Sequence, residues 1–271
     1  MSTETPDASG TLQRLWGVQA GGRRGPKPAL SVDRILDAAA VLADAEGLQA
    51  VSMAKIADSL GFSPMALYRH VSNKDELLVL LADRIAGDLP DLPADAGWRE
   101  GLRLWMRAQI EMIVARPWFL ELPLSAILPG PRGMRWIDQA FAVMAPLDLG
   151  FEEKLGIVGI LSEHVLGAAR VEVESRRTAS ATLRASGAVA ADVPDDQIDP
   201  AALAAANPYA GFETVMSELA DPERFPHIFA SLAGWEPSAQ PPPPDPDGGI
   251  EFGLEVVLDG IEAYVGRHTG S

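Results

Sequence analysis

A short stretch near residue 65 concentrates side chains that can hydrogen-bond a nucleic acid. Tyr68, Arg69 and Lys74 carry donors that suit phosphate oxygens, and an arginine can also pair with guanine through two hydrogen bonds. Met65 and Ala66, which come just before them, suit contact with the methyl group of thymine. The stretch therefore indicates a surface that reads double-stranded DNA.

The residues around this stretch predict the elements that must position it. Ser52 is a good N-cap for a helix over Met53–Leu60, and Gly61 can adopt the positive φ at its end. Ser63 then caps a further helix that has Pro64 at its first position. Two short helices joined through a glycine are typical of a helix-turn-helix, whose second helix enters the major groove with its N-terminus first.

Flanking helices complete the predicted domain. Ser31 is the expected N-cap of an amphipathic helix over 32–46, which Gly47 ends. Asn73 is the expected N-cap of the helix after the recognition helix, whose first amides form a phosphate clamp together with Lys74. The full set of predicted DNA-binding residues is Arg23, Arg24, Lys27, Ser52, Ser63, Pro64, Met65, Ala66, Tyr68, Arg69, His70 and Lys74.

Each of these residues also has an ordinary structural explanation. Tyr68 and His70 are compatible with interfacial side chains of any small helical domain, and Arg69 and Lys74 with solvated surface charge. Helix-turn-helix spacing is itself a weak signal, because any two short helices around a glycine satisfy it. The specific signal is the whole ordered set.

The charge distribution is compatible with a DNA partner. The net charge is −16, yet residues 23–90 carry eight basic and nine acidic groups, whereas residues 91–271 carry thirteen and twenty-seven. Phosphate binding depends on the local supply of cations, so an almost neutral head can bind DNA if its basic groups share one face. The acidic remainder is then repelled by the phosphates, which favours one orientation on the duplex.

Composition and boundaries suggest an intracellular protein with three parts. We expect a flexible N-terminal arm over 1–30, a DNA-binding domain over 31–90 and a larger helical domain over 91–271. The chain has no cysteine, no apolar run of signal-peptide type and no membrane-spanning stretch. A cytoplasmic, nucleoid-associated location without any membrane contact is the expectation.

The residues of the predicted head resemble the N-terminal domain of the tetracycline-repressor family. The resemblance rests on Ile35–Ala39, Gly47, Val51–Met53, Ile56–Ala57, Leu60–Ser63, Leu67–Val71 and Lys74–Leu78. It implies an all-α fold, in which a three-helix helix-turn-helix domain precedes a larger helical ligand-binding and dimerisation domain. It further implies a homodimer on a palindromic operator, which usually represses and is released by a small molecule.

The remainder of the chain shows helical periodicity over 97–116, 131–145, 151–180 and 250–266. The last two helices carry apolar stripes that fit either a dimer interface or the internal core, and periodicity cannot separate the two. By resemblance we expect the interface. Residues 186–208 and 236–249 are expected to be linkers, with short helices over 209–219 and 225–232 between them.

Aromatic and methionine side chains of this second domain suit an apolar or planar effector. The predicted ligand-binding residues are Trp105, Met106, Gln109, Trp118, Met134, Trp136, Phe141 and His164. Ordinary core packing is the alternative for each of them. No cofactor, metal site or catalytic arrangement is expected, since Leu161–His164 lacks the glycines of a nucleophile elbow and a second zinc-binding histidine. The alternative functions are a regulator of the same fold without an effector, and an activator.

Overall fold

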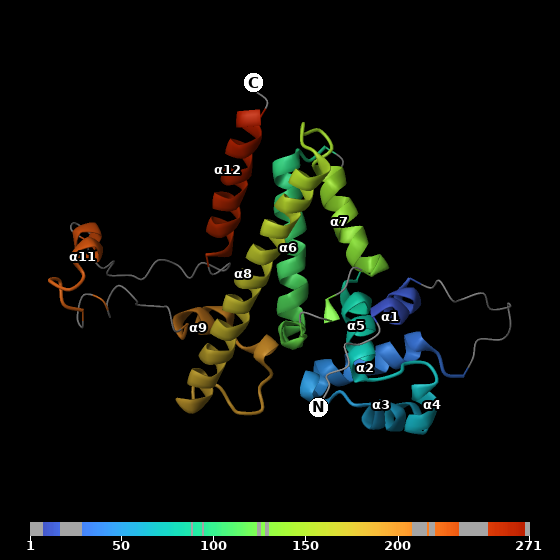
Figure 1. The fold of residues 1–271 in the computed structure, drawn as a ribbon. Coiled ribbons are helices and arrows are strands. Elements are labelled where there is room, and N and C mark those ends of the chain that lie inside the picture. Colours follow the sequence, from blue (N-terminus) through green and yellow to red (C-terminus); the bar gives the residue numbers. More distant parts are fainter. Residues whose placement is uncertain are drawn as a thin grey trace. The chain divides into compact units, whose positions relative to one another are not determined.

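The structure is a computed structural model of the chain. It describes residues 8–16, 29–87, 89–93, 95–123, 126–127, 130–207, 216, 220–232 and 249–268. The regular elements within these ranges are all helices, so the expected all-α fold is confirmed (Figure 1).

The head, residues 29–87, contains the helices that the capping signals predicted. They are α2 (Val32–Glu46), the 3-10 turn η1 (Leu48–Ala50), α3 (Met53–Leu60), α4 (Pro64–Tyr68) and α5 (Lys74–Ile85). The Ser31 hydroxyl accepts the N–H of Arg34 at 3.3 Å, and Gly47 ends α2 with φ +80°. Local chemistry thus determines where α2 begins and ends.

One compact core holds the head helices together. Its fully buried members include Ile35, Ala39, Ile56, Ala57, Leu67, Val71, Leu77 and Leu81. Apart from Val71, which lies between α4 and α5, they come from α2, α3, α4 and α5, so each of these helices contributes to the same cluster. Burial of this apolar surface is the main source of stability for so small a group of helices.

The body, the described residues from 95 onward, is built from longer helices (Figure 1). They are α6 (Trp98–Ala115), the 3-10 turn η2 (Pro117–Glu121), α7 (Pro131–Val143), α8 (Phe151–Ala185) and α12 (Ile250–His268). Three short elements lie between α8 and α12, namely η4 (Asp195–Gln197), α9 (Pro200–Ala205) and α11 (Pro226–Leu232). Most of 209–219 and 236–249 lies outside the described residues.

The segment after α8 is more ordered than the linker we expected. Arg184 donates to the carbonyl oxygen of Val193 at 2.7 Å and pairs with Asp195 at 2.5 Å. Ile198 is buried, and Asp199 caps α9 by accepting the N–H of Ala201. A proline-rich and glycine-containing composition therefore did not prevent local packing here.

The chain forms two compact units. One comprises residues 1–166 and 258–271, and the other comprises residues 167–257. The first unit includes the head together with α6 and α7, so the head packs directly on part of the body. The boundary that we predicted near residue 90 stays an interpretation of the sequence.

A helix occupies part of the predicted N-terminal arm. Helix α1 (Ala8–Leu15) packs against α5, Thr11 is buried, and Arg14 forms an ion pair with Glu76. The flexible arm that we expected over 1–30 is thus corrected for these residues. Long-range contacts with α5, which composition does not reveal, supply the stabilisation.

No helix in the described part of the chain combines the length and the apolar character needed to cross a bilayer.

Candidate nucleic-acid interface

The turn between α3 and α4 has the geometry that a helix-turn-helix needs. Ser52 caps α3 by accepting the N–H of Lys55 at 3.3 Å, as predicted. Gly61 adopts φ +73°, the left-handed conformation that glycine accepts without strain. The N–H of Phe62 donates to the Ala57 carbonyl at 2.9 Å and closes the end of α3. Helices α3 and α4 therefore lie side by side (Figure 1).

Buried side chains orient α4. Leu67 and Val71 are fully buried in the head core, as the sequence suggested for Leu67. Ser63 occupies the N-cap position of α4, but its side chain makes no capping hydrogen bond, which corrects its predicted capping role. Its hydroxyl is consequently available to an external acceptor such as a phosphate.

The predicted DNA-reading side chains lie on the outside of this frame. Met65 and Tyr68 are 69% and 47% exposed, so neither side chain is part of the head core. The other exposed members of the predicted set are Ser63, Pro64, Arg69 and Lys74, whereas Ser52, Ala66 and His70 are half-buried. The exposed members thus gather on α4 and at the start of α5.

Helix α5 begins where the sequence predicted its clamp. The Asn73 side chain accepts the N–H of Glu76 at 2.8 Å, which confirms Asn73 as the N-cap. Lys74 follows at the first helical position and is exposed. An exposed ammonium beside a helix N-terminus is a favourable arrangement for an anion.

Other basic residues of the head contribute less to this face. Lys55 pairs with Glu46 at 2.7 Å, and Arg84 pairs with Asp37 at 2.6 Å. Arg23, Arg24 and Lys27, which the sequence assigned to DNA binding, lie outside the described residues. Within the described head, Arg69 and Lys74 are the cations of the α4–α5 face.

The indole groups of Trp105 and Trp136 in the body make hydrogen bonds within the protein. Trp105 is buried and donates its Nε1–H to the Trp136 carbonyl at 2.9 Å, and the two rings pack edge to face. Trp136 donates its own Nε1–H to the Ala86 carbonyl at 2.8 Å, which joins α7 to the residue after α5. Hydrogen bonds to the backbone are typical of structural tryptophans.

Trp118 lies in a different environment from the other predicted ligand-binding residues. It belongs to the head core, and its Nε1–H donates to Asp44 of α2 at 2.7 Å. Arg116 donates to the same carboxylate at 3.3 Å. We therefore assign Trp118 to the contact between η2 and the head, a role that no local pattern could reveal because its partner is distant in the sequence.

The remaining predicted ligand-binding residues differ in how much surface they offer. Met106 is fully buried, Gln109 and Phe141 are half-buried, and Met134 is partly exposed. Gln109 donates to the carbonyl of Trp105 at 3.3 Å. His164 is half-buried on α8, its Nε2 has no hydrogen-bond partner, and burial lowers its pKa from the usual value. His164 thus carries a buried polar atom that no hydrogen bond in the described part of the chain satisfies.

Two aspartates that the sequence did not single out connect the head to the body. Asp44 receives Trp118 and Arg116, as described above. Asp83 of α5 is buried, and its carboxylate accepts the N–H groups of Arg132 and Gly133 at 3.0 Å each. It thereby caps the N-terminus of α7, where the helix dipole favours a negative charge. The sequence signal for Asp83 was an acidic side chain near the C-terminal end of an amphipathic helix.

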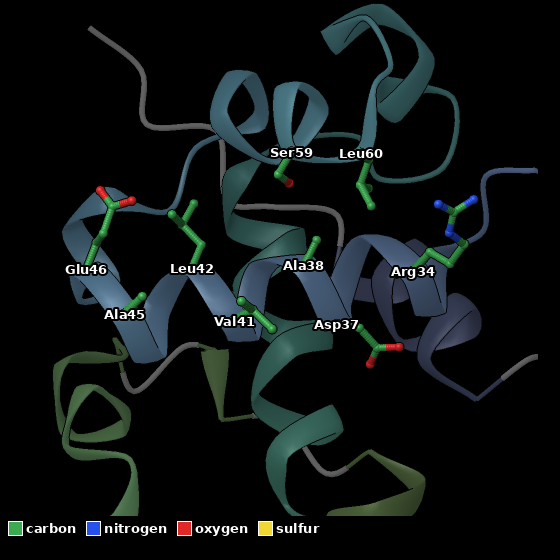
Figure 2. Close-up of a pocket in the computed structure, with 9 residues that line it drawn as sticks. All are labelled: Arg34, Asp37, Ala38, Val41, Leu42, Ala45, Glu46, Ser59 and Leu60. Atoms are coloured by element: carbon green, nitrogen blue, oxygen red, sulfur yellow. The ribbon is translucent and has the colours of Figure 1, made fainter.

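An apolar groove runs along the outer face of the head. Its volume is about 560 Å³, and Figure 2 shows Ala38, Val41, Leu42 and Ala45 of α2 facing Leu60 of α3. Arg34, Asp37 and Glu46 add charge around it. Its lining includes no predicted ligand-binding residue, so this groove is separate from the effector site that the sequence suggested.

A helix-turn-helix with exposed donors, attached to a helical body, defines a DNA-binding regulator. Comparison with known proteins gives its family. A family model described as "Bacterial regulatory proteins, tetR family" matches residues 35–81, and one described as "Tetracyclin repressor-like, C-terminal domain" matches residues 89–265. The chain belongs to the tetR family of bacterial transcriptional regulators.

Individual relatives agree with this assignment. The chain is similar to the HTH-type transcriptional repressor DrrR1 of Streptomyces coeruleorubidus, with 31% identity over 99% of this chain and 92% of that protein. It is also similar to ActR of Streptomyces coelicolor crystallised with actinorhodin, with 26% identity and a TM-score of 0.61 over 88% of this chain and 99% of ActR. Apo ActR has 25% identity and a TM-score of 0.62, over 88% and 98%. The chain is accordingly a TetR-family transcriptional repressor.

Proposed function

We propose that this repressor binds a palindromic operator as a homodimer and releases it when a small apolar or aromatic effector occupies the body. The exposed row on α4 and at the start of α5 carries the proposal, because buried Leu67 and Val71 hold it facing outward. Side chains with no packing role inside the protein are free to contact an external partner.

The roles within that row follow from chemistry. Tyr68 and Lys74 donate to phosphates, Arg69 donates to phosphate or guanine, and Met65 contacts thymine methyl groups. The surface that faces the major groove of DNA is completed by Ser63, Pro64, Ala66 and His70. Ser52 adds a hydroxyl at the start of α3. Arg23, Arg24 and Lys27 are expected to add contacts from the N-terminal segment.

Exposed apolar side chains on α8 and α12 support the dimer. On α8 these are Leu155, Ile160 and Val171, and on α12 they are Phe252 and Val256. Most of the stripes predicted from periodicity are internal, since Val158, Val165, Ala169, Val173, Leu254, Leu258 and Ile261 are buried within one chain, although Leu155 of the α8 stripe is exposed. The exposed apolar positions of the two helices are the ones left for a second copy.

The dimer is tested by charge on that face. Phe252→Asp and Val256→Asp should shift the protein from dimer to monomer in sedimentation, because each buries a charge in an apolar contact. Val41→Asp, at an equally exposed apolar position on α2, is the matched control and should leave the dimer intact. A dimer that survives both α12 substitutions would assign the interface elsewhere.

The similarity to ActR supports a small-molecule effector, since ActR has been crystallised with actinorhodin. His164 and Gln109 are the polar residues proposed to orient such a compound, and Met134 and Phe141 are proposed to contact its apolar part. Trp105, Met106 and Trp136 are buried, and we assign them to the core.

The decisive experiment uses the full-length chain. DNA duplexes are selected from a random library by the protein, and binding is then titrated by fluorescence anisotropy with and without actinorhodin and a panel of other aromatic compounds. Selected sequences with two-fold symmetry and release by at least one compound support the proposal. Asymmetric sequences would refute the palindrome, and unchanged affinity across the panel would favour the regulator without an effector.

A further inference from the structure

The turn that leads into α5 is held by a buried carboxylate. Glu76 is 3% exposed, and its Oε2 accepts the N–H of Ser72 at 2.6 Å. Its own N–H donates to the Asn73 side chain at 2.8 Å. Glu76 therefore fixes the backbone of Ser72 and Asn73, directly before the exposed Lys74.

The other carboxylate oxygen of Glu76 faces a separate part of the chain. Oε1 forms an ion pair with the guanidinium of Arg14, which lies on α1. A buried carboxylate is costly unless an opposite charge and hydrogen bonds compensate it. Arg14 supplies that charge and leaves Oε2 to Ser72, so α1 is connected to the turn through a single side chain.

Helix α1 also packs against the residue that precedes α7. Thr11 is buried, and Leu15 packs on the head core. A Cβ added to Gly130 would lie 2.9 Å from Cδ2 of Leu15 and would clash with the Asp83 carboxylate. The end of α1, the Asp83 cap and the residue before α7 thus meet closely.

We propose that α1 is a positioning element for DNA binding, in which Arg14 acts through Glu76 to hold the Ser72–Lys74 turn against the operator backbone. The inference rests on the proposed function, because it assigns a role in DNA affinity to a helix outside the helix-turn-helix. Arg14 is a positioning residue in this scheme and makes no contact with DNA. Leu15 and Gly130 extend the same support to the first turn of α7.

A double-mutant cycle separates this role from a direct phosphate contact. Arg14→Gln should lower affinity for the selected duplex about tenfold and reduce the dependence of binding on salt by up to about one ion. In the Glu76→Gln background, which removes the buried charge, the same substitution should have little further effect. If Arg14 touched phosphate itself, its effect would persist in that background and the proposal would be overturned.

Two further variants make the result specific. Arg14→Lys keeps the charge and should restore most of the affinity. Arg176→Gln breaks an exposed pair with Glu172 on α8 and should not alter DNA binding. Thermal unfolding of each variant reports folding independently, so a purely structural role of Arg14 would lower the melting temperature without changing affinity or salt dependence, and that result would overturn the proposal.

The outcome for this inference is distinguishable from the outcome for the proposed function. Selection of a symmetric duplex by the unmodified protein establishes operator binding. An Arg14→Gln variant that binds this duplex as tightly as the unmodified protein would then refute the role of α1 alone. Failure of the unmodified protein to select any duplex would overturn both.

Discussion

The exposed surface on α4 and α5 of the head, which we propose faces DNA, and two tryptophans of the body use polar atoms in opposite ways. On α4 and α5, Tyr68, Arg69 and Lys74 lie outside the core, and Leu67 is the fully buried residue of α4. In the body, the indole N–H groups of Trp105 and Trp136 both donate hydrogen bonds to backbone carbonyls. Residue type therefore says little about binding until the partner of each polar atom is known.

The contrast also explains why the sequence identifies the predicted DNA-binding residues more clearly than the predicted effector-binding residues. A duplex is a large partner, so its contacts lie on an open surface and leave the core untouched. A small molecule needs an enclosed site, whose walls are the same side chains that stabilise the fold. A buried aromatic residue can therefore belong either to the core or to a ligand site, whereas the exposure of Tyr68, Arg69 and Lys74 leaves them outside the core.

The largest expected effect tests the structural role of the body tryptophans. Trp105→Ala should destabilise the protein by about 3–5 kcal/mol, because it leaves a cavity and removes the hydrogen bond to Trp136. Chemical denaturation measures this loss. Trp105→Phe keeps most of the volume and should cost clearly less. If Trp105→Ala left the unfolding free energy unchanged, Trp105 would not be structural and would again be a candidate ligand-binding residue.

An intermediate effect tests the contact between the two regions. Asp83→Ala should destabilise the protein by about 1–3 kcal/mol, since two partly buried N–H groups at the start of α7 lose their acceptor. Asp138→Asn, at an exposed position on α7, is the control and should stay within about 0.5 kcal/mol of the unmodified protein. Equal stability of both variants would show that the Asp83 cap contributes nothing.

The DNA face should respond in affinity rather than in stability. Tyr68→Ala and Lys74→Ala should each weaken binding to all sequences by about tenfold and lower the salt dependence by about one ion for Lys74. Their unfolding free energies should change by less than about 0.5 kcal/mol. Tyr68→Phe removes the hydroxyl alone and isolates its hydrogen bond. Unchanged affinity in both alanine variants would remove these residues from the interface.

The smallest expected effect concerns pH. Burial lowers the pKa of His164 below its ordinary value of 6.5. The unfolded chain therefore binds the proton more readily, so the stability that neutral His164 contributes is complete above about pH 6.5 and is lost as the pH falls through the lower folded pKa. His164→Gln should flatten the stability profile on the acid side of about pH 6.5, measured by thermal unfolding. If His164→Gln left the dependence of stability on pH unchanged, burial would not be lowering the pKa of His164.

Much of the head could be predicted because its signals are local. Ser31, Ser52 and Asn73 cap the helices that follow them, and Gly61 adopts the expected positive φ. A capping hydrogen bond joins residues three apart, so its presence is legible from spacing. The bounds of α2 and α3 agree with the sequence for this reason.

The body illustrates where such reasoning ends. Periodicity found α8 and α12, but the stripes it named are mainly the internal faces. Trp118 was grouped with the other tryptophans although it packs in the head core, because its partner Asp44 is 74 residues away. Helix α1 was missed for a similar reason, since its anchor, Glu76, lies 62 residues from Arg14.

By itself the sequence determined the helical class, the helix-turn-helix and the outward-facing residues of its second helix, since caps, glycine conformation and amphipathic spacing act over a few residues. The tertiary structure alone decided which tryptophans are structural, which faces of α8 and α12 stay exposed and how α1, Asp44 and Asp83 join the head to the body. Those outcomes depend on packing between residues far apart in the chain. The energy of such a contact depends on both residues together, so the sequence around either one alone does not predict it.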